Sequence, residues 1–290
     1  MNDRIREENG IILMGLSRFL NEHPRLVTPQ VMRELTEECA LSPEEAFGIL
    51  LATAMGLEID KNPHDRRLYM TYFPEMIHAL DAAVYRRDPY FSTLHIPSRK
   101  NGRWELCEQE YAPYEAFVFD DFHYSADGRV YPQIGFFSEA YRYPVVLESG
   151  REWMLITPNE INTMRAPIGA AHGKVLTFGL GLGYYAFMVS EKPEVASVTV
   201  IERDRDVIRL FSEHILPQLP CRDKIEIVCA DAFDYAALEM GRVGYDTVFC
   251  DLWHDASDGV ALYLRMKELE HHAPEARFDY WIENTLKYYL

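Results

Sequence analysis

A short apolar run followed by closely spaced glycines marks the centre of this sequence. Residues Lys174–Thr177 have valine and leucine at their core, which is typical of a buried strand. Three alternate glycines follow, Gly179, Gly181 and Gly183, and Tyr184–Ser190 has helical character. This arrangement brings backbone N–H groups and the positive end of a helix to one point, which suits an anionic or polar ligand. A side chain at the glycines would keep a ligand away from the backbone. The pattern predicts a ligand-binding turn, although such turns also join strands to helices for structural reasons alone.

Three later apolar runs each end in an acidic residue. They are 197–202, 224–231 and 245–251, which end in Glu202, Asp231 and Asp251. In an open α/β sheet the carboxyl ends of parallel strands meet at one edge, and the ligand crevice lies there. A single acid at a strand end is more often a helix cap. Three of them behind a glycine turn favour a nucleoside site, with Glu202, about 20 positions after Gly179, placed to accept both ribose hydroxyls.

The first half of the chain has different periodicities. Up to about residue 87 apolar residues recur at helical spacing, and Ser42–Glu45 and Asn62-Pro63 mark helix starts. From 88 to 158 the chain is aromatic-rich and strand-like, and turns at Ala126–Gly128 and Ser149-Gly150 predict two β-hairpins. We therefore expect a helical module over 1–87, an antiparallel β module over 88–158 and a Rossmann-like domain over 159–290.

Composition narrows the classes of partner. A net charge of −17 argues against nucleic acid, because phosphate binding depends on Lys and Arg patches. The five cysteines form no C-x-x-C pair, and Cys229 and Cys250 fall within expected buried strands, which indicates a reducing cytoplasm. No signal peptide or long apolar run is found, so we expect neither secretion nor a membrane span. No spacing of metal ligands is found either.

The acidic residues help to choose between nucleoside cofactors. The dinucleotide pattern G-x-G-x-x-G fails from Gly179 and holds only as G-x-G-x-x-A from Gly181 to Ala186, which leaves a nicotinamide cofactor open. A pyrophosphate would be repelled by Asp231 and Asp251. These carboxylates suit a neutral or cationic ligand with a base amine and a sulfonium, and that ligand is S-adenosylmethionine.

The motif order resembles the class I S-adenosylmethionine-dependent methyltransferase superfamily, and within it the spermidine synthase-like group. The matching segments are 175–183, 198–208, 225–234 and 245–251. The resemblance implies a Rossmann-like class I methyltransferase sheet, with Glu202 on the ribose, Asp231 and the Ala232 amide on the adenine, and the glycine turn beside the methionine portion. A fifth strand is expected over 277–282, and the last antiparallel pair of such sheets is not found, so the α/β sheet is expected to be shortened at its C-terminal end.

Several positions depart from the spermidine synthase pattern. Leu182 replaces an aspartate of the glycine turn, and Thr177 stands where many class I enzymes have an acid. Asp251-Leu-Trp-His-Asp255 replaces an Asp-Ser-Ser/Thr-Asp-Pro run, and only Glu160 matches well in the Asp-Glu-x-x-Tyr-Gln element. Because the carboxylates that would hold a polyamine are largely missing, we expect no aminopropyl transfer to putrescine.

Transfer from a sulfonium requires alignment, exclusion of water and, for some acceptors, a proton acceptor. Asp251 is the first candidate for contact with the nucleophile, since it ends the fourth strand at the crevice. His254 and Asp255 are close enough in the sequence to supply a base, although a histidine in such a loop is more often a surface or capping group. Tyr184 and Glu160 are candidate substrate contacts, and core packing is the alternative for Tyr184.

Three functions stay open at this point. The first is an S-adenosylmethionine-dependent methyltransferase that acts on an unidentified small molecule. The second is a spermidine synthase-like aminopropyltransferase, and the third is a non-catalytic protein that binds a nucleoside cofactor. The expected partner is a small-molecule acceptor, with no nucleic acid and no membrane, and the N-terminal modules are the candidate surface for a homodimer.

Overall fold

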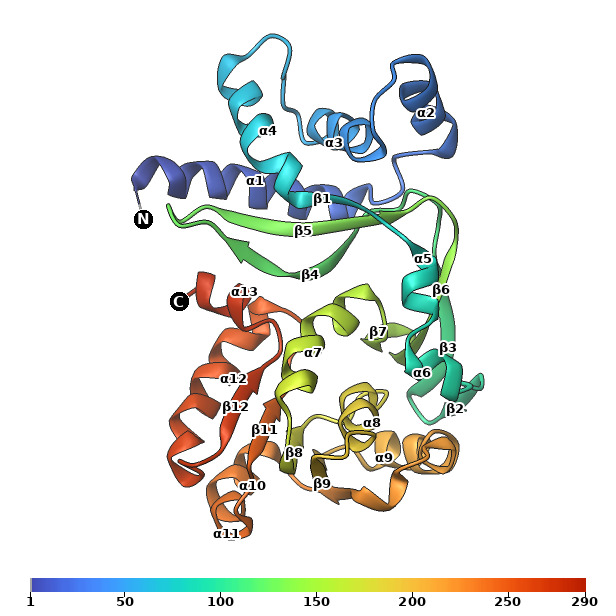
Figure 1. Cartoon of the computed structure of the whole chain (residues 1–290), viewed down its shortest axis with the longest axis vertical. Helices are drawn as coiled ribbons and strands as arrows, with labels where there is room; N and C mark the ends of the chain where they lie inside the picture. The colour runs from blue at the N-terminus through green and yellow to red at the C-terminus, as the bar shows by residue number, and fades with distance from the viewer. Residues whose placement is uncertain (1) are drawn as a thin grey trace. The chain divides into compact units, whose positions relative to one another are not determined.

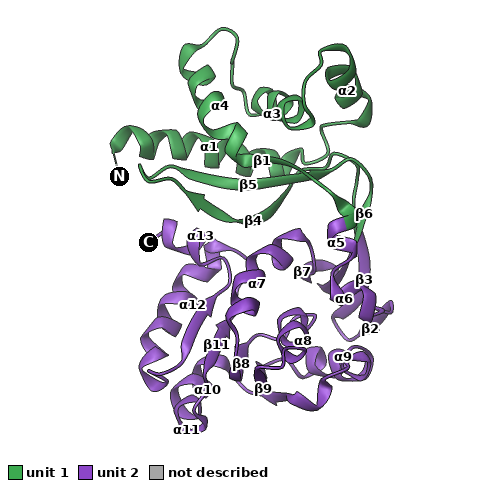
Figure 2. Cartoon of the chain, viewed as in Figure 1, with its two compact units in different colours: residues 1–83, 110–142 green, residues 84–109, 143–290 purple. Residues whose placement is uncertain are grey.

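The chain folds into two compact units, each built from two stretches of sequence (Figures 1 and 2). The computed structural model describes residues 2–290. The first unit contains the residues up to 83 together with 110–142, and the second contains 84–109 and 143–290. The β module expected over 88–158 therefore contributes strands to both units, because its two hairpins pair into different sheets.

The first unit packs helices onto a three-stranded sheet. Its helices are α1 (Asp3–Glu22), α2 (Pro29–Arg33), the π-helical turn η1 (Glu34–Glu38), α3 (Pro43–Ala54) and α4 (Pro63–Met76). The sheet has the order β1-β5-β4, with strands β1 (Ile77–Leu80), β4 (Phe117–Tyr124) and β5 (Val130–Phe137). The capping box at Ser42 and Glu45 and the β4–β5 hairpin are confirmed. Apolar faces of α1, α3 and α4 meet the sheet in one core, in which Phe47 stacks on Phe136 at 4.2 Å.

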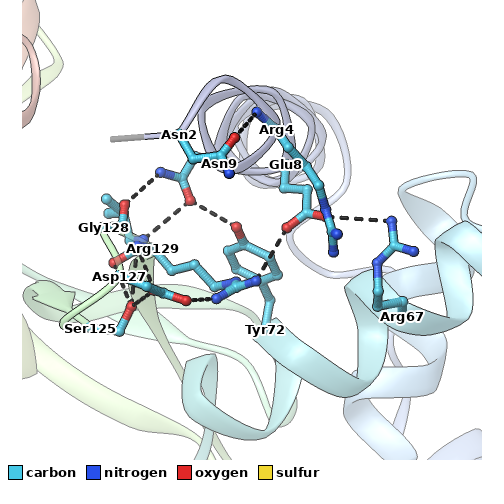
Figure 3. Close-up of polar contacts among 11 residues, drawn as sticks. Asn2, Arg4, Glu8, Asn9, Arg67, Tyr72, Ser125, Asp127, Gly128 and Arg129 are labelled. Atoms are coloured by element: carbon cyan, nitrogen blue, oxygen red, sulfur yellow. Dashed lines mark hydrogen bonds and ion pairs between the residues drawn. The ribbon is translucent and has the colours of Figure 1, made fainter.

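A buried charged residue fixes α1 in this unit (Figure 3). The Glu8 side chain is only 3% exposed, and its carboxylate pairs with Arg4 at 2.8 Å, Arg67 at 3.4 Å and Arg129 at 3.6 Å. Burial alone would raise the pKa of Glu8, but the hydrogen bond from Arg4 and the three positive charges lower the pKa below its usual value. A buried carboxylate is tolerated here because cations from α1, α4 and the β4–β5 turn surround it.

The neighbouring residue Asn9 satisfies backbone groups of the same turn (Figure 3). Its side-chain nitrogen donates to the Gly128 carbonyl at 3.1 Å, and its oxygen accepts from Tyr72 Oη at 2.8 Å and the Val130 amide at 3.2 Å. Glu8 and Asn9 therefore specify how α1 lies on the hairpin, which helical periodicity alone does not reveal.

The second unit begins with short helices and a four-stranded antiparallel sheet. The boundary helix is α5 (Ala82–Arg86), and α6 (Pro89–Thr93) follows. The sheet has the order β2-β3-β6-β7, with strands β2 (Arg99–Asn101), β3 (Trp104–Tyr111), β6 (Tyr141–Glu148) and β7 (Arg151–Leu155). The predicted hairpin across Ser149-Gly150 is confirmed as the β6–β7 pair.

A five-stranded parallel sheet with a Rossmann-like order forms the rest of the second unit. Its order is β10-β9-β8-β11-β12, and every neighbouring pair is parallel. The strands are β8 (Gly173–Phe178), β9 (Val195–Glu202), β10 (Ile225–Cys229), β11 (Thr247–Cys250) and β12 (Arg277–Tyr280). This is the fold class expected from the sequence. The order reverses between β8 and β11, so the crevice of such a sheet lies at their carboxyl ends.

Helices connect these strands. They are α7 (Pro158–Ala170), α8 (Tyr184–Ser190), α9 (Arg205–His214), α10 (Ala232–Leu238), α11 (Met240–Val243), α12 (Ala256–Leu269) and α13 (Glu283–Tyr288), with 3-10 turns η2 (Leu216–Gln218), η3 (Arg222–Lys224) and η4 (Glu270–His272). Cys250 is buried as expected, but the expectation for Cys229 is wrong: it is exposed, because β10 is an edge strand of the sheet.

Within residues 2–290, no helix is both long and apolar enough to cross a membrane.

Candidate functional site

A cavity of about 470 Å³ opens at the carboxyl ends of the parallel strands, within the second unit. The glycine turn after β8, the ends of β9, β10 and β11, and the β11–α12 loop line it together with β7 and α7. Most of the predicted site residues lie on its wall: Gly179, Gly181, Tyr184, Glu160, Glu202, Asp231, Ala232, Asp251 and His254. The fold therefore gathers residues that are separated by up to about 90 positions of sequence, because parallel strands end at one edge.

The glycine turn is shaped by packing as well as by access to the cavity. All three glycines have positive φ, at 99° for Gly179, 56° for Gly181 and 75° for Gly183. A Cβ on Gly179 would overlap the Asp251 carbonyl oxygen, and one on Gly183 would overlap the Phe211 ring. Only Gly181 has tolerable space, with Met154 Sδ at 3.3 Å from its added Cβ. Glycine at 179 and 183 is thus required by the protein itself, whereas the sequence suggested room for a ligand.

Glu202 ends β9 with its carboxylate next to the glycine turn. One oxygen accepts from the Leu180 amide at 3.4 Å and the other from the Asp204 amide at 2.8 Å. Burial, the largest effect, raises the pKa of Glu202 despite these hydrogen bonds. Because the contact with the Leu180 amide is long, this oxygen can still accept a second, stronger hydrogen bond from a ligand in the cavity.

Asp231 lies at the end of β10 as the N-cap of α10. Its Oδ1 accepts from the Phe233 amide at 2.9 Å and the Asp234 amide at 3.1 Å. The capping interpretation therefore holds for this acid, and its exposed side chain also lies on the cavity wall beside Ala232. One carboxylate oxygen can cap the helix while the other faces a ligand.

Asp251 lies at the centre of the wall, immediately after β11. Its side chain is half-buried, and no hydrogen bond to it is found among residues 2–290. Burial, and then the nearby Glu160 carboxylate, raise the pKa of Asp251 to about 7. Glu160 itself accepts from the Thr157 amide at 2.9 Å in the capping box of α7, and burial raises its pKa as well. Two carboxyls with raised pKa values therefore share one side of the cavity.

The β11–α12 loop holds the other candidates for proton transfer. His254 lies on the cavity wall, where its Nδ1 is 3.2 Å from Asp258 Oδ2 and its ring is 4.2 Å from the Trp153 ring. Asp258 also accepts from the His254 amide at 3.1 Å. The structure places Asp255 outside the lining residues, as the N-cap of α12 with its carboxylate on the Ser257 amide at 2.6 Å. Asp255 is therefore a capping residue in this geometry.

Residues at the start of α6 form hydrogen bonds with the glycine turn and with the first residue of α8. Sequence motifs did not identify them. Tyr90 is fully buried and donates to the Leu182 carbonyl at 2.8 Å. Asp88 accepts from Tyr184 Oη at 2.9 Å. Tyr184 is itself buried, so it contributes both to the wall and to the core. No sequence motif signals this contact, because its partners are about 90 positions apart.

The wall is strongly acidic. Its carboxylates are Glu152, Glu160, Glu202, Asp231, Asp251 and Asp258, and its only guanidinium is that of Arg203. Sequence motifs did not identify Glu152 and Asp258. No group of three or more His, Cys, Asp or Glu side chains that could hold a metal ion is found within residues 2–290. The arrangement suits a cationic organic ligand, because a nearby opposite charge stabilises each carboxylate in its ionised form.

Comparison with known proteins gives a partial likeness of fold. No protein-family model and no curated protein matches this chain. The chain is similar in part to spermidine synthases. The spermidine synthase of Thermotoga maritima is 20% identical over 42% of this chain and 48% of that chain, with a TM-score of 0.32. A spermidine synthase in complex with the transition-state analogue AdoDATO is 20% identical over 39% of this chain and 43% of that chain, also at 0.32.

A third solved structure is a conserved hypothetical protein of Streptococcus pyogenes. It is 17% identical over 34% of this chain and 61% of that chain, with a TM-score of 0.28. In all three the matched part is less than two thirds of the solved chain. Each of these likenesses covers less than half of this chain.

Proposed function

We propose that this protein is an S-adenosylmethionine-dependent methyltransferase that acts on a small molecule bound in the cavity of the second unit. The observation that carries the proposal is the Asp251 carboxylate. It lies on the wall beside the glycine turn, has no hydrogen-bond donor among residues 2–290, and has its pKa raised to about 7. A half-buried carboxyl kept without a partner destabilises the fold, and such groups are characteristic of functional sites.

The lining residues fit the cofactor in size and charge. A volume of about 470 Å³ lies within the usual range for small-molecule sites. Glu202 would accept the ribose hydroxyls, Asp231 and the Ala232 amide would contact the adenine, and the glycine turn would lie along the methionine portion. When bound, S-adenosylmethionine supplies a methyl group on a positively charged sulfur, which the acidic wall favours.

The residues of this chain have a limited part in the transfer. In the transfer, a lone pair of the acceptor would form the bond to the methyl carbon, and the electron pair of the broken carbon–sulfur bond would remain on sulfur as a neutral thioether. Asp251, ionised, takes the proton that the acceptor loses. A carboxyl with a pKa near 7 suits this task, because about half of it is ionised at neutral pH and the ionised form still binds a proton well. Buried aromatic side chains, Trp253 and Trp281, exclude water from the same wall.

Aminopropyl transfer is a second candidate, and the acidic wall favours it. A polyamine acceptor requires carboxylates along a cationic chain, and Glu152, Glu160 and Asp258 lie on the wall with Asp251. The departures in the sequence motifs predicted that the carboxylates for a polyamine were largely missing, with only Glu160 matching well. Glu152 and Asp258 come from segments outside those motifs, so the expectation of no transfer to putrescine requires a direct test.

Parallel turnover assays separate the candidates. The protein is incubated with S-adenosylmethionine and a panel of small amines and phenols, and separately with decarboxylated S-adenosylmethionine and putrescine. Mass spectrometry should detect S-adenosylhomocysteine in the first reaction, and Asp251→Asn should suppress it. Exposed Asp223 serves as the matched control, as Asp223→Asn should leave the rate unchanged.

The other outcomes have clear meanings. If the second reaction yields methylthioadenosine and spermidine, and Asp251→Asn suppresses them, the protein is an aminopropyltransferase and not a methyltransferase. Binding of S-adenosylhomocysteine without turnover of any acceptor in the panel would support the non-catalytic alternative. A preference for NADPH over S-adenosylhomocysteine would overturn the cofactor assignment itself.

The homodimer through the N-terminal modules remains a proposal. Exposed apolar side chains of the first unit, Met14 on α1 and Met70 on α4, are candidates for such a surface, at 70% and 66% exposure. Sedimentation equilibrium of the protein and of Met14→Ser with Met70→Ser would decide it. A monomer at micromolar concentration would refute it.

A further inference from the structure

The turn between β2 and β3 reaches the loop that carries Glu202. Arg103, in this turn, pairs through Nη2 with Asp204 Oδ2 at 2.6 Å and through Nε with Glu148 Oε1 at 2.9 Å. Asp204 lies in the loop that follows β9, two positions after Glu202. Arg103 therefore links the antiparallel sheet to the loop at the end of β9, across about 100 positions of sequence.

Asp204 connects Arg103 to Glu202 through its own backbone amide. Its backbone amide donates to Glu202 Oε1 at 2.8 Å, and its Oδ1 accepts from the Asp206 amide at 2.8 Å at the start of α9. Burial would raise the pKa of Asp204, but the Asp206 and Val207 amides and the Arg103 guanidinium lower it below the usual value. Asp204 is thus held as a carboxylate by the helix start on one side and by Arg103 on the other.

The hairpin that presents Arg103 is itself well fixed. The Arg103 carbonyl accepts from the Ser149 amide at 2.7 Å, which joins the β2–β3 turn to the β6–β7 turn. The guanidinium lies over the Trp104 ring at 5.2 Å, and Trp104 contacts Trp153 of the cavity wall at 5.5 Å. A side chain held at both of its ends loses less freedom on forming its ion pairs, so its position is more strongly determined.

We propose that Arg103 is a positioning residue for the nucleoside site, which acts through Asp204 to hold the Glu202 carboxylate in the geometry that accepts the ribose hydroxyls. The inference rests on the proposed function, since it takes Glu202 as the ribose contact. Arg103 does not line the cavity and touches no ligand in this account. Its effect is therefore on the selectivity of the site for ribose.

Ribose discrimination measures this role directly. Calorimetry with adenosine and with 2′-deoxyadenosine should show that the unsubstituted protein prefers adenosine by about 10- to 100-fold, the worth of a hydrogen bond to a charged group. Arg103→Ala should lower this ratio by at least about threefold, as expected for coupled members of one network. Arg103→Lys, which keeps the charge but not the fork, should retain part of the ratio.

Matched controls separate positioning from general stability. Glu148→Gln removes the other partner of Arg103 and should leave the ratio unchanged. Arg142→Ala removes an exposed arginine that pairs with Glu110 at 3.2 Å in the first unit, and should also leave it unchanged. In the Glu202→Ala background, Arg103→Ala should have no further effect on the ratio.

Four results would overturn the inference. Arg103→Ala that weakens adenosine and 2′-deoxyadenosine equally would show a structural role only. Glu148→Gln with the same loss of discrimination would assign the effect to hairpin packing. A protein that binds neither nucleoside nor S-adenosylhomocysteine would overturn the proposed function and this inference together, whereas ribose-selective binding that Arg103→Ala leaves intact overturns the inference alone.

Discussion

The backbone of Gly179 packs directly against the carbonyl of Asp251, so that a Cβ at position 179 would overlap the Asp251 oxygen. The Asp251 amide also donates to the Phe178 carbonyl at 3.0 Å. The glycine turn after β8 and Asp251 after β11, the candidate proton acceptor, therefore contact each other directly. The contact lies where the strand order of the sheet reverses. The position of the Asp251 carboxylate depends on this contact.

Replacement of Gly179 by alanine should therefore destabilise the protein severely. The expected loss is about 3–5 kcal/mol in the free energy of unfolding, since the change combines overlap with a φ of 99°. Gly150→Ala is the matched control, as Gly150 has a φ of 84° but open space around it, and should cost about 1 kcal/mol. Urea denaturation measures both. Equal losses would mean that the contact with Asp251 relaxes without cost.

Removal of the Glu202 carboxylate should weaken nucleoside binding. Glu202→Ala is expected to cost about 2–4 kcal/mol of affinity for S-adenosylhomocysteine, because two charge-assisted hydrogen bonds to the ribose are lost. Isothermal titration calorimetry gives the difference directly. Asp234→Ala, an exposed acid of α10 outside the cavity lining, is the comparison. Unchanged affinity for the Glu202 variant would refute the ribose assignment.

The raised pKa of Asp251 predicts a pH-dependent cost in stability. The folded protein holds this proton up to about pH 7, whereas the unfolded chain releases it near the ordinary value of 3.8. Stability should therefore fall as the pH rises from about 4 to 7 and stay level above. Asp251→Asn removes this loss and should gain about 2 kcal/mol at pH 7 over its effect at pH 4, a figure reduced for solvent screening. Thermal unfolding of both proteins across this range tests it; parallel curves would contradict the shift.

The same group predicts the pH profile of the proposed transfer. Because Asp251 must be ionised to accept a proton, kcat/KM should rise with pH through an apparent pKa near 7. Glu160→Gln removes the neighbouring negative charge and should shift this rise to lower pH. The pH dependence of single-substrate kinetics provides the measurement. A rise that persists unchanged in Asp251→Asn would assign it to another group.

The buried Glu8 carboxylate is expected to stabilise the first unit. Glu8→Gln should lower the free energy of unfolding by about 3 kcal/mol, since it leaves three arginines around a neutral buried group. The pKa of Glu8 is lowered in the folded protein, so the stabilisation is present above the ordinary value of 4.5 and is lost as the pH falls below it. Glu22→Gln, at an exposed pair with Arg18, is the control and should change stability by less than about 0.5 kcal/mol. Similar losses for both variants would contradict the role of burial.

The comparison of sequence and structure is clearest for the parallel sheet. The expected helix over 184–190 coincides with α8, and four expected strands coincide with β8, β9, β10 and β11 to within a few residues at their ends. Each was predictable because a buried parallel strand has a continuous apolar run and a glycine or acid where it ends. Cys229 was misjudged because an apolar run looks the same in an edge strand and in a central one.

Some residues of the candidate site could likewise be predicted from the sequence, and others could not. Glu202, Asp231 and Asp251 were found from the sequence, since each follows a strand and strand ends meet at one edge. Asp255 had the same local signal, but its side chain caps α12, and only backbone geometry distinguishes the two uses of an acid. Tyr90 and Arg103 carried no signal, because their partners, Leu182 and Asp204, lie about 90 to 100 positions away.

The sequence by itself determined the strands, the glycine turn and the acids at the strand ends, because these depend on local periodicity and on backbone conformations that few residues adopt. The tertiary structure alone decided which strands of the first half pair with which, why glycine is required at 179 and 183, and which carboxylates share the cavity. It also raised the pKa of Asp251, through burial and the nearby Glu160 carboxylate. These properties depend on burial and on charges brought close by the fold, and neither is encoded in the neighbours of a residue along the chain.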